Sequence, residues 1–138
     1  MYESLTKYLD VFKECDFGEW IIDEKEVHFP YVNYDDAVRD FLDDVMVFVD
    51  AHEEMDLKRY FLILEDLGIE KSTEAVAEAD PEALDGRGVM ALIVASMRGD
   101  RFCEGFLLHL LDEGCVVKWL KRLKGIDGNE QASNRRTI

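Results

Sequence analysis

The chain has 138 residues and a mass of 16.0 kDa, and 48% of its residues are hydrophobic, which supports one folded domain with its own core and excludes wholesale disorder. Its formal net charge is −15, and residues 1–85 hold 7 lysine and arginine residues against 25 acidic ones. Most of the chain would repel the phosphate backbone of a nucleic acid, so direct nucleic acid binding through a general basic surface is disfavoured.

The sequence also predicts the cellular setting. No apolar run approaches the ~20 residues that span a bilayer, and residues 1–4 lack the basic and apolar segments of a signal peptide. Cys15, Cys103 and Cys115 are odd in number and lack CxxC spacing. These features predict a reduced, cytoplasmic protein that does not contact a membrane.

The first half predicts helices with one acidic face. Residues 4–14 have the spacing of an amphipathic helix, and Asn33 or Tyr34 is expected to cap a second helix. The apolar positions of the second helix recur at three- and four-residue spacing: Val38, Phe41, Leu42, Val45, Phe48 and Val49. Its other positions are rich in aspartate: Asp36, Asp40, Asp43, Asp44 and Asp50. Such a face is usually solvated, and it is also a possible recognition surface.

Residues 16–33 differ from the helical segments. Two short β-favouring runs, 20–22 and 27–29, flank the charged residues 23–26, which predicts a small hairpin or an extended arm packed across the helices. The segment and its end are dense in aromatic side chains: Phe17, Trp20, His28, Phe29, Tyr31 and Tyr34. Such side chains either close the core as a lid, which is the commoner use in a small domain, or anchor an interface.

The second half predicts a buried centre. Residues 89–97 are apolar or small on all sides, as in a central helix. Gly99 is expected to end that helix, Asp100 to cap the next one, and Gly114 to end this second helix before a basic last helix. Phe102 is expected on the apolar face of the second helix and Gly105 inside it, while Cys103 is expected to be a buried structural thiol.

Shorter helices are expected between these two halves. Residues 57–67 predict a helix that Gly68 ends, and Ser72 and Asp80 are start signals for two short helices, the second with Pro81 at its first position.

Motifs for catalysis or metal binding are missing from the sequence. The glycines fit neither a phosphate-binding loop nor a dinucleotide fingerprint, and no serine lies in a nucleophile elbow. The run from His52 to Asp56 resembles a zinc-protease motif only superficially, because an aspartate replaces the second histidine. We therefore expect no metal and no cofactor, and the sequence favours a protein that is not an enzyme.

One charged stretch between the central helices stands out as a candidate site. Arg98, Asp100, Arg101 and Glu104 place two arginines and two acids within seven residues. They could form an internal ion-pair clasp, or one guanidinium could face a cleft and hold a carboxylate or phosphate. The clasp is favoured because polar groups within a core need partners.

Residues 29–31 (Phe-Pro-Tyr) and the run Arg98-Gly-Asp-Arg-Phe102, followed by Gly105 and Gly114, resemble a family of small bacterial proteins of unknown function. The resemblance covers about residues 5–123. It implies no activity, but it draws attention to Arg101 and its neighbours.

The predicted fold is mainly α. We expect a single compact helical bundle of about six to seven helices over residues 1–124, with a short extended or hairpin arm near residues 17–34. A polar C-terminal tail is expected over residues 125–138.

Three functions remain open. The leading hypothesis is a non-enzymatic protein-interaction domain whose acidic surface binds a basic protein, in its sharper form as an antagonist of that protein or a nucleic-acid mimic. The rival is a small-molecule-binding or enzymatic domain with a pocket between the arm and residues 98–104. The third is a homo-oligomeric structural protein that self-associates through the arm. The candidate ligand or interaction residues are Arg98, Asp100, Arg101, Glu104, Trp20, Tyr31 and His28.

Overall fold

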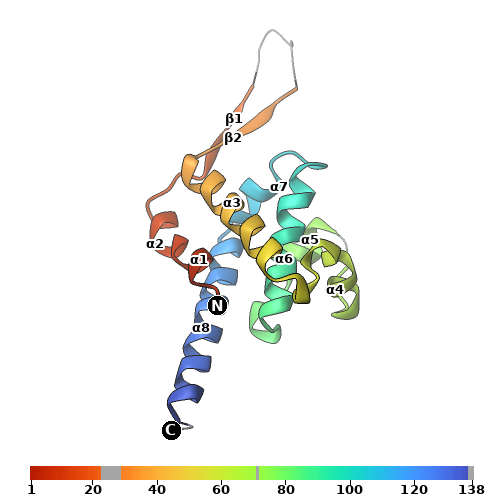
Figure 1. Ribbon diagram of the computed structural model, residues 1–138. Coiled ribbons are helices and arrows are strands. Elements are labelled where there is room, and N and C mark those ends of the chain that lie inside the picture. The colour runs from red at the N-terminus through yellow and green to blue at the C-terminus, as the bar shows by residue number, and fades with distance from the viewer. Residues whose placement is uncertain (23–28, 71, 137–138) are drawn as a thin grey trace.

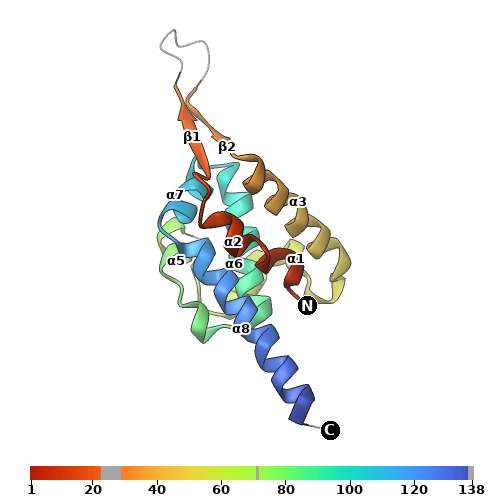
Figure 2. The same ribbon diagram turned by 90° about the vertical axis from the view of Figure 1, so that its left-hand side faces the viewer.

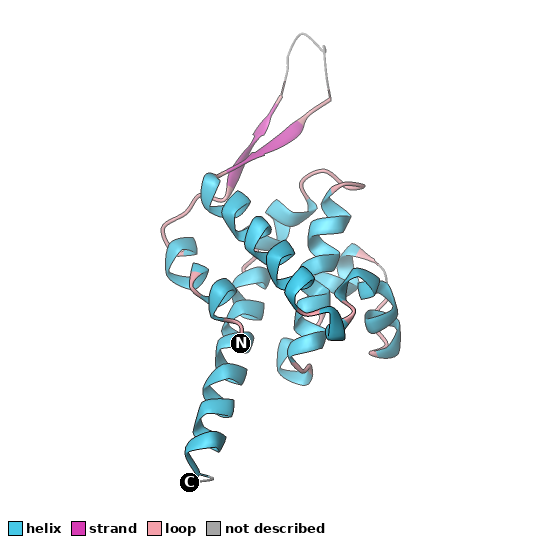
Figure 3. Ribbon diagram, viewed as in Figure 1, coloured by secondary structure: helices cyan, strands magenta, loops and turns pink. Residues whose placement is uncertain are grey.

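The computed structural model describes residues 1–22, 29–70 and 72–136, with side chains as far as residue 129. Two strands pair, and the other elements are helical (Figures 1 and 3). The strands are β1 (Gly18–Ile21) and β2 (Tyr31–Tyr34). The α-helices are α1 (Glu3–Thr6), α2 (Tyr8–Phe12), α3 (Asp36–Ala51), α4 (Tyr60–Asp66), α5 (Thr73–Glu78), α6 (Gly86–Asp100), α7 (Phe106–Asp112) and α8 (Cys115–Arg136). Short 3-10 helices lie at Glu53–Met55, Leu57–Arg59 and Pro81–Ala83. The predicted mainly helical bundle with a hairpin is confirmed.

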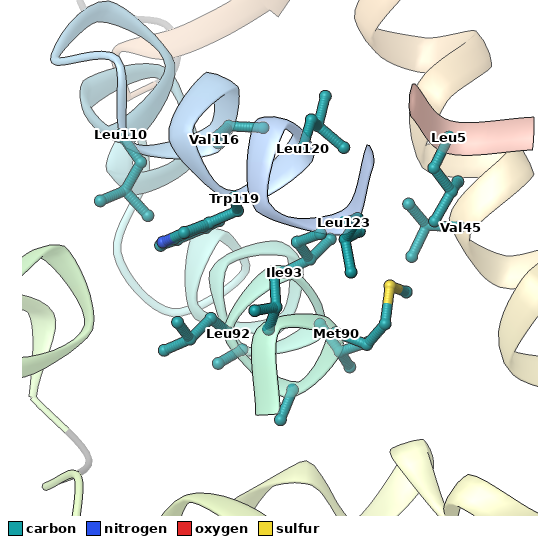
Figure 4. Close-up of a cluster of buried hydrophobic side chains, with 14 of the residues drawn as sticks. Leu5, Val45, Met90, Leu92, Ile93, Leu110, Val116, Trp119, Leu120 and Leu123 are labelled. Carbon is teal, nitrogen blue, oxygen red and sulfur yellow. The ribbon is translucent and has the colours of Figure 1, made fainter. Parts of the chain in front are cut away.

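Helix α6 is the centre of the core. Every residue from 88 to 96 is buried, as the apolar and small residues of this stretch predict, and α4, α5, α7 and α8 all contact the helix. Figure 4 shows how α8 lies across it, with the Trp119 ring close to Leu92 and Ile93. Trp119 is 1% exposed, so this contact removes a large aromatic surface from water.

The N-terminal segment and α3 cover another side of the core. The helix expected over residues 4–14 is two short helices that meet at a turn at Lys7. The rings of Tyr8 and Phe12 pack edge-on against Phe41 of α3, with centroids 5.3 and 5.4 Å apart. The apolar stripe predicted for α3 is confirmed, but the N-cap residue is Asp35 rather than Asn33 or Tyr34.

Glycines and capping side chains mark several of the helix ends. Gly68 and Gly114 have positive φ just after α4 and α7, as predicted. The Ser72 hydroxyl accepts from Ala75 N, and Asp80 Oδ1 accepts from Glu82 N, so both predicted start signals are confirmed. Asp85 was not singled out, yet its carboxylate caps α6 by accepting from Gly88 N.

The link between α6 and α7 differs from the expectation. α6 continues through Gly99 to Asp100, so Gly99 does not end it. Gly105 lies at the N-cap position of α7 with φ 87°, rather than inside a helix. Only glycine adopts this conformation without strain, and the chain reverses direction here. We call residues 98–105 the corner.

Helix α8 extends past the expected boundary at residue 124. Asp127 is 8% exposed, and its Oδ2 accepts from the backbone amide of Tyr2 at 2.9 Å. The start of the chain is therefore packed against the second half of α8, and the residues expected to form a tail include the last turns of this helix. In the described part of the chain, no helix is long and apolar enough to cross a membrane.

The hairpin projects from one end of the bundle, and the C-terminal turns of α8 extend from the opposite end (Figures 1 and 2). Its strands pair antiparallel in the register Gly18 with Tyr34, Glu19 with Asn33, Trp20 with Val32 and Ile21 with Tyr31. The charged residues 23–26 and the candidate His28 lie outside the described residues. We call β1, β2 and residues 22, 29 and 30 the arm.

Candidate functional site

The arm has two faces, and one of them is turned toward the corner. Directly paired residues of antiparallel strands point to the same face. Trp20 and Val32 are therefore on one face, and Val32 is only 7% exposed. Ile21 and Tyr31 are on the other face, and Tyr31 is 44% exposed.

Three contacts attach the inner face to the corner. The ring of Trp20 lies against Gly105 so closely that a β-carbon on this glycine would overlap it. The backbone amide of Val32 donates to Glu104 Oε1 at 2.8 Å. The base of the arm is thus held by an aromatic contact and by charge-assisted hydrogen bonds.

The third contact joins Tyr34 to Asp100. The Tyr34 hydroxyl donates to Asp100 Oδ1 at 2.9 Å and accepts from the amide of Leu108 at 3.1 Å. Asp100 Oδ1 also accepts from the amide of Leu107 at 3.1 Å. These two side chains satisfy free amides in the first turn of α7. The sequence predicts Asp100 to be the N-cap residue of this helix, but it is the last residue of α6, and Gly105 has the N-cap position. Burial, and then the Asp100 carboxylate, raise the pKa of Tyr34 above its ordinary value, so the phenol stays neutral at physiological pH.

The two arginines of the corner have a different role from its acids. Arg98 is half-buried and Arg101 is exposed, and neither forms an ion pair with any described residue. The favoured ion-pair clasp is therefore wrong, because Asp100 and Glu104 accept from the arm and from α7 instead. Among the candidates, the fold brings Trp20, Asp100 and Glu104 together. It leaves Tyr31 on the outer face and Arg101 in solvent.

Apolar side chains at this end of the molecule are unusually exposed. Phe29 is 91% exposed, Ile22 68% and Trp20 46%. On the corner, Phe102 is 91% exposed and Cys103 is also exposed. The expectation that Phe102 lies on a buried helical face and that Cys103 is a buried thiol is wrong, because both residues belong to the turn before α7. Contiguous exposed apolar patches occur at protein–protein interfaces and at ligand-binding grooves, so these residues are candidates for either.

The acidic face of α3 begins beside the arm. Asp36, Asp40 and Asp43 are exposed, recur at helical spacing, and have no ion-pair partner among the described residues. We call these three residues the acidic face. Further along the helix the charge is partly neutralised, because Asp44 lies 3.2 Å from Lys7 Nζ and Asp50 lies 3.5 Å from Lys58 Nζ.

The hydroxyl of Tyr8 interacts with carboxylates of α3. It donates to Asp44 Oδ2 at 2.6 Å. Burial and this bond raise the pKa of Tyr8 above its ordinary value, with smaller contributions from Asp40 and Asp43. Asp40, Asp43 and Asp44 of α3 therefore all act electrostatically on the Tyr8 hydroxyl of α2.

No metal site is present among the described residues: they hold no group of three or more His, Cys, Asp or Glu side chains placed to bind an ion. Residues 53–55 form a 3-10 helix, and Asp56 has a left-handed backbone, so His52 and Asp56 do not share a helix face. His52 stacks on Phe48, with ring centroids 4.0 Å apart, and its Nδ1 lies 2.9 Å from the Phe48 carbonyl oxygen. This histidine has a structural role.

The sequence did not indicate a pocket on the side of the corner that faces α4 and α5. It has a volume of about 370 Å³, and it is lined by parts of α4, α5, α6, the corner and α7. Arm residues do not line it. The residues that line it are far apart in the chain, so spacing along the sequence could not predict the pocket. The sequence predicts one of them, Phe102, on a buried helical face and not in an exposed turn.

Comparisons with known proteins assign no activity. No curated protein matches the chain, and no solved structure does. Residues 65–129 match the sequence model of a family of unknown function (DUF6508), a segment that includes α5, α6, the corner and α7 but not the arm.

Proposed function

We propose that this protein is a non-enzymatic, cytoplasmic protein-binding domain that recognises a basic partner through the outward parts of the arm and the acidic face. The observation that carries the proposal is an arm that is attached to the corner through Trp20, Val32 and Tyr34 and that exposes apolar side chains. Phe29 and Ile22 are 91% and 68% exposed, whereas Val32, three residues after Phe29, is 7% exposed and hydrogen-bonded through its amide to Glu104.

A fixed base favours binding. Association costs free energy when side chains and loops must be ordered at the interface. Trp20, Val32 and Tyr34 are already held by the corner, so part of that cost is met in the free protein. Aromatic anchors that are buried by a partner dominate most interface energies, and Phe29 is a suitable anchor.

The acidic face indicates the charge of the partner. Asp36, Asp40 and Asp43 lie on the helix that follows the arm, and no described basic residue neutralises them. A basic surface would be attracted to them, which raises the association rate and suppresses wrong partners. A second copy of the chain, also at −15, would bring like charges together. Electrostatics therefore favour a basic partner over self-association through this surface.

The test is a pull-down from a lysate of the source organism with matched variants. Phe29→Ser with Ile22→Ser removes the apolar anchors, and Asp36→Asn with Asp40→Asn and Asp43→Asn removes the acidic face. Leu62→Ser, on the exposed side of α4, is the control for loss of an exposed apolar residue. We expect the wild type and the Leu62→Ser control to capture one basic protein, and neither the arm variant nor the acidic-face variant to capture it. High salt should release the protein, because the Debye length falls to ~3 Å at 1 M.

Two results would contradict the proposal. If both variant sets capture the same protein as the wild type, the arm and the acidic face are not the contact. If the captured protein is a further copy of this chain, and light scattering of the pure protein gives a dimer that Phe29→Ser and Ile22→Ser dissociate, the homo-oligomeric alternative is correct.

We also infer that the matched family is the bacterial one that residues 29–31 and 98–102 resemble. The match over residues 65–129 includes the second of these segments and supports the inference.

A further inference from the structure

We propose that the pocket between α4, α5, α6 and the corner binds a small, uncharged, mainly aromatic or aliphatic molecule. This site is separate from the surface proposed above, because no arm residue and no residue of α3 lines it. Its volume of about 370 Å³ is within the range of small-molecule sites, roughly 300–1,000 Å³.

The floor of the pocket reaches the core. Leu64, Val76 and Ala95 line it and are 1%, 4% and 7% exposed, so each belongs to a well-packed helix. These residues present a preformed apolar surface from three different helices. Because this floor is already almost fully buried, the free energy of removing apolar surface from water would come mainly from the exposed rim, Phe61 and Phe102. The floor supplies a fixed wall that a ligand does not have to order first.

The rim is aromatic. Phe61 and Phe102 line the pocket and are 36% and 91% exposed, and the ring of Phe106 lies close behind. A β-carbon at Gly99 would come within 2.8 Å of the Phe106 ring, so the glycine leaves this ring its place in the wall. An aromatic ring of a ligand could stack against these faces, and Phe102 would lose much of its exposed surface.

The polar groups of the lining are hydroxyls. Ser72 Oγ accepts from Ala75 N and can still donate its own hydrogen, while the hydroxyls of Tyr60 and Thr73 have no hydrogen-bond partner among the described residues. None of the described residues that line the pocket is charged. A charged ligand would lose its hydration here without an opposite charge to replace it, whereas a neutral ligand needs only one or two hydrogen bonds.

Two fluorescent probes of the same ring skeleton test the site. N-phenyl-1-naphthylamine is uncharged, and 1-anilinonaphthalene-8-sulfonate adds one sulfonate. Titrations in about 0.5 M salt suppress the general repulsion between the acidic protein and the sulfonate, because the Debye length falls to ~4 Å. We expect saturable binding of the uncharged probe with one site per chain, and binding of the sulfonate at least about tenfold weaker.

Variants locate the binding. Thr73→Trp places a large side chain at an exposed position of the lining, and Ala95→Leu fills the floor; each is expected to weaken the uncharged probe at least about tenfold. Leu62→Trp on α4, outside the lining, and Phe29→Ser on the arm are expected to leave binding unchanged. A thermal melt of each variant verifies folding, and Thr73→Trp alone decides the result if Ala95→Leu does not fold.

The inference is overturned if no saturable binding occurs, if Thr73→Trp binds the probe as the wild type does, or if Phe29→Ser abolishes binding. Equal affinity for the two probes would overturn the assignment to uncharged ligands. None of these outcomes depends on whether the arm binds a protein.

Discussion

The hydroxyl of Tyr34 joins the arm to α7 through Asp100, 66 positions later in the chain. The same oxygen accepts from the amide of Leu108, so one atom completes both the base of the arm and the first turn of α7. The corner is therefore a fixed point between a projecting hairpin and a buried helix. Its acids, Asp100 and Glu104, act as hydrogen-bond acceptors.

Replacing Tyr34 with phenylalanine is expected to lower the free energy of unfolding by about 1–3 kcal/mol, because Asp100 and the Leu108 amide each lose a partner in a partly buried place. Urea unfolding followed by circular dichroism measures this change. Tyr60→Phe is the control, since the Tyr60 hydroxyl bonds to no described residue, and it should change stability by less than ~0.5 kcal/mol. Equal effects of the two substitutions would contradict the role of Tyr34.

Alkaline pH tests the same bond independently. The pKa of Tyr34 in the folded protein is raised by burial and by Asp100, while that of an unfolded tyrosine is 10.0. The unfolded chain therefore releases its proton first, so this contribution to stability is complete below pH 10 and is lost as the pH rises above it. We expect the unfolding free energy of the wild type to fall more steeply above pH 10 than that of Tyr34→Phe. Parallel curves for the two proteins would refute the shift.

The contact between Trp20 and Gly105 can be separated from the backbone requirement at Gly105. Alanine at Gly105 must adopt a left-handed backbone and must also displace the indole of Trp20. Alanine at Gly114, where φ is 80°, has no atom within 4 Å of the new β-carbon, so its only cost is the left-handed backbone. The backbone cost is about 1–2 kcal/mol at each position. Chemical denaturation should show that Gly105→Ala costs more than Gly114→Ala.

A second background completes this experiment. In a protein that carries Trp20→Ala, Gly105→Ala should cost no more than Gly114→Ala, because the ring that it would displace is gone. If Gly105→Ala remains the more harmful change in that background, the close approach of Trp20 is not the cause.

Local and periodic signals predicted most of the fold. The all-round apolar pattern of residues 89–97 placed the central helix, and Gly68, Gly114, Ser72 and Asp80 marked helix ends through chemistry that acts within a few residues. These elements depend on their own sequence and on burial alone, so one sequence was enough to locate them.

The corner was misread for a physical reason. Apolar spacing continues without a break from Phe102 to Leu111, so periodicity predicts one helix there. In the structure the chain turns at Gly105, and Trp20, 85 positions earlier, packs on this glycine. Spacing along the chain carries no information on such a contact, and for the same reason it could not indicate the pocket beside α4 and α5.

Phe102 and Phe106 provide a direct test of this reading of the corner. Phe106 is 7% exposed and packs beside Gly99, whereas Phe102 is 91% exposed. Phe106→Ala is expected to lower the unfolding free energy by about 3–5 kcal/mol, and Phe102→Ala by less than ~0.5 kcal/mol. Urea denaturation of the two variants under identical conditions measures both. Similar losses would mean that Phe102 is buried after all and that the helix begins before it.

The acid limit of stability should depend on Asp44. A hydrogen bond from Tyr8, and then Lys7, hold the pKa of this carboxyl below its ordinary value of 3.8. The folded protein thus keeps the carboxylate at a pH where the unfolded chain is already protonated, so the stabilisation is present above the unfolded pKa and is lost as the pH falls through the folded one. We expect Asp44→Asn to be less stable than the wild type at pH 7 and the difference to shrink below about pH 4. Asp10→Asn is the control, because Asp10 is an exposed partner of Lys13 and should have little effect at either pH. A difference between wild type and Asp44→Asn that stays constant from pH 7 to pH 3 would show that the ionised form of Asp44 is not what stabilises the fold.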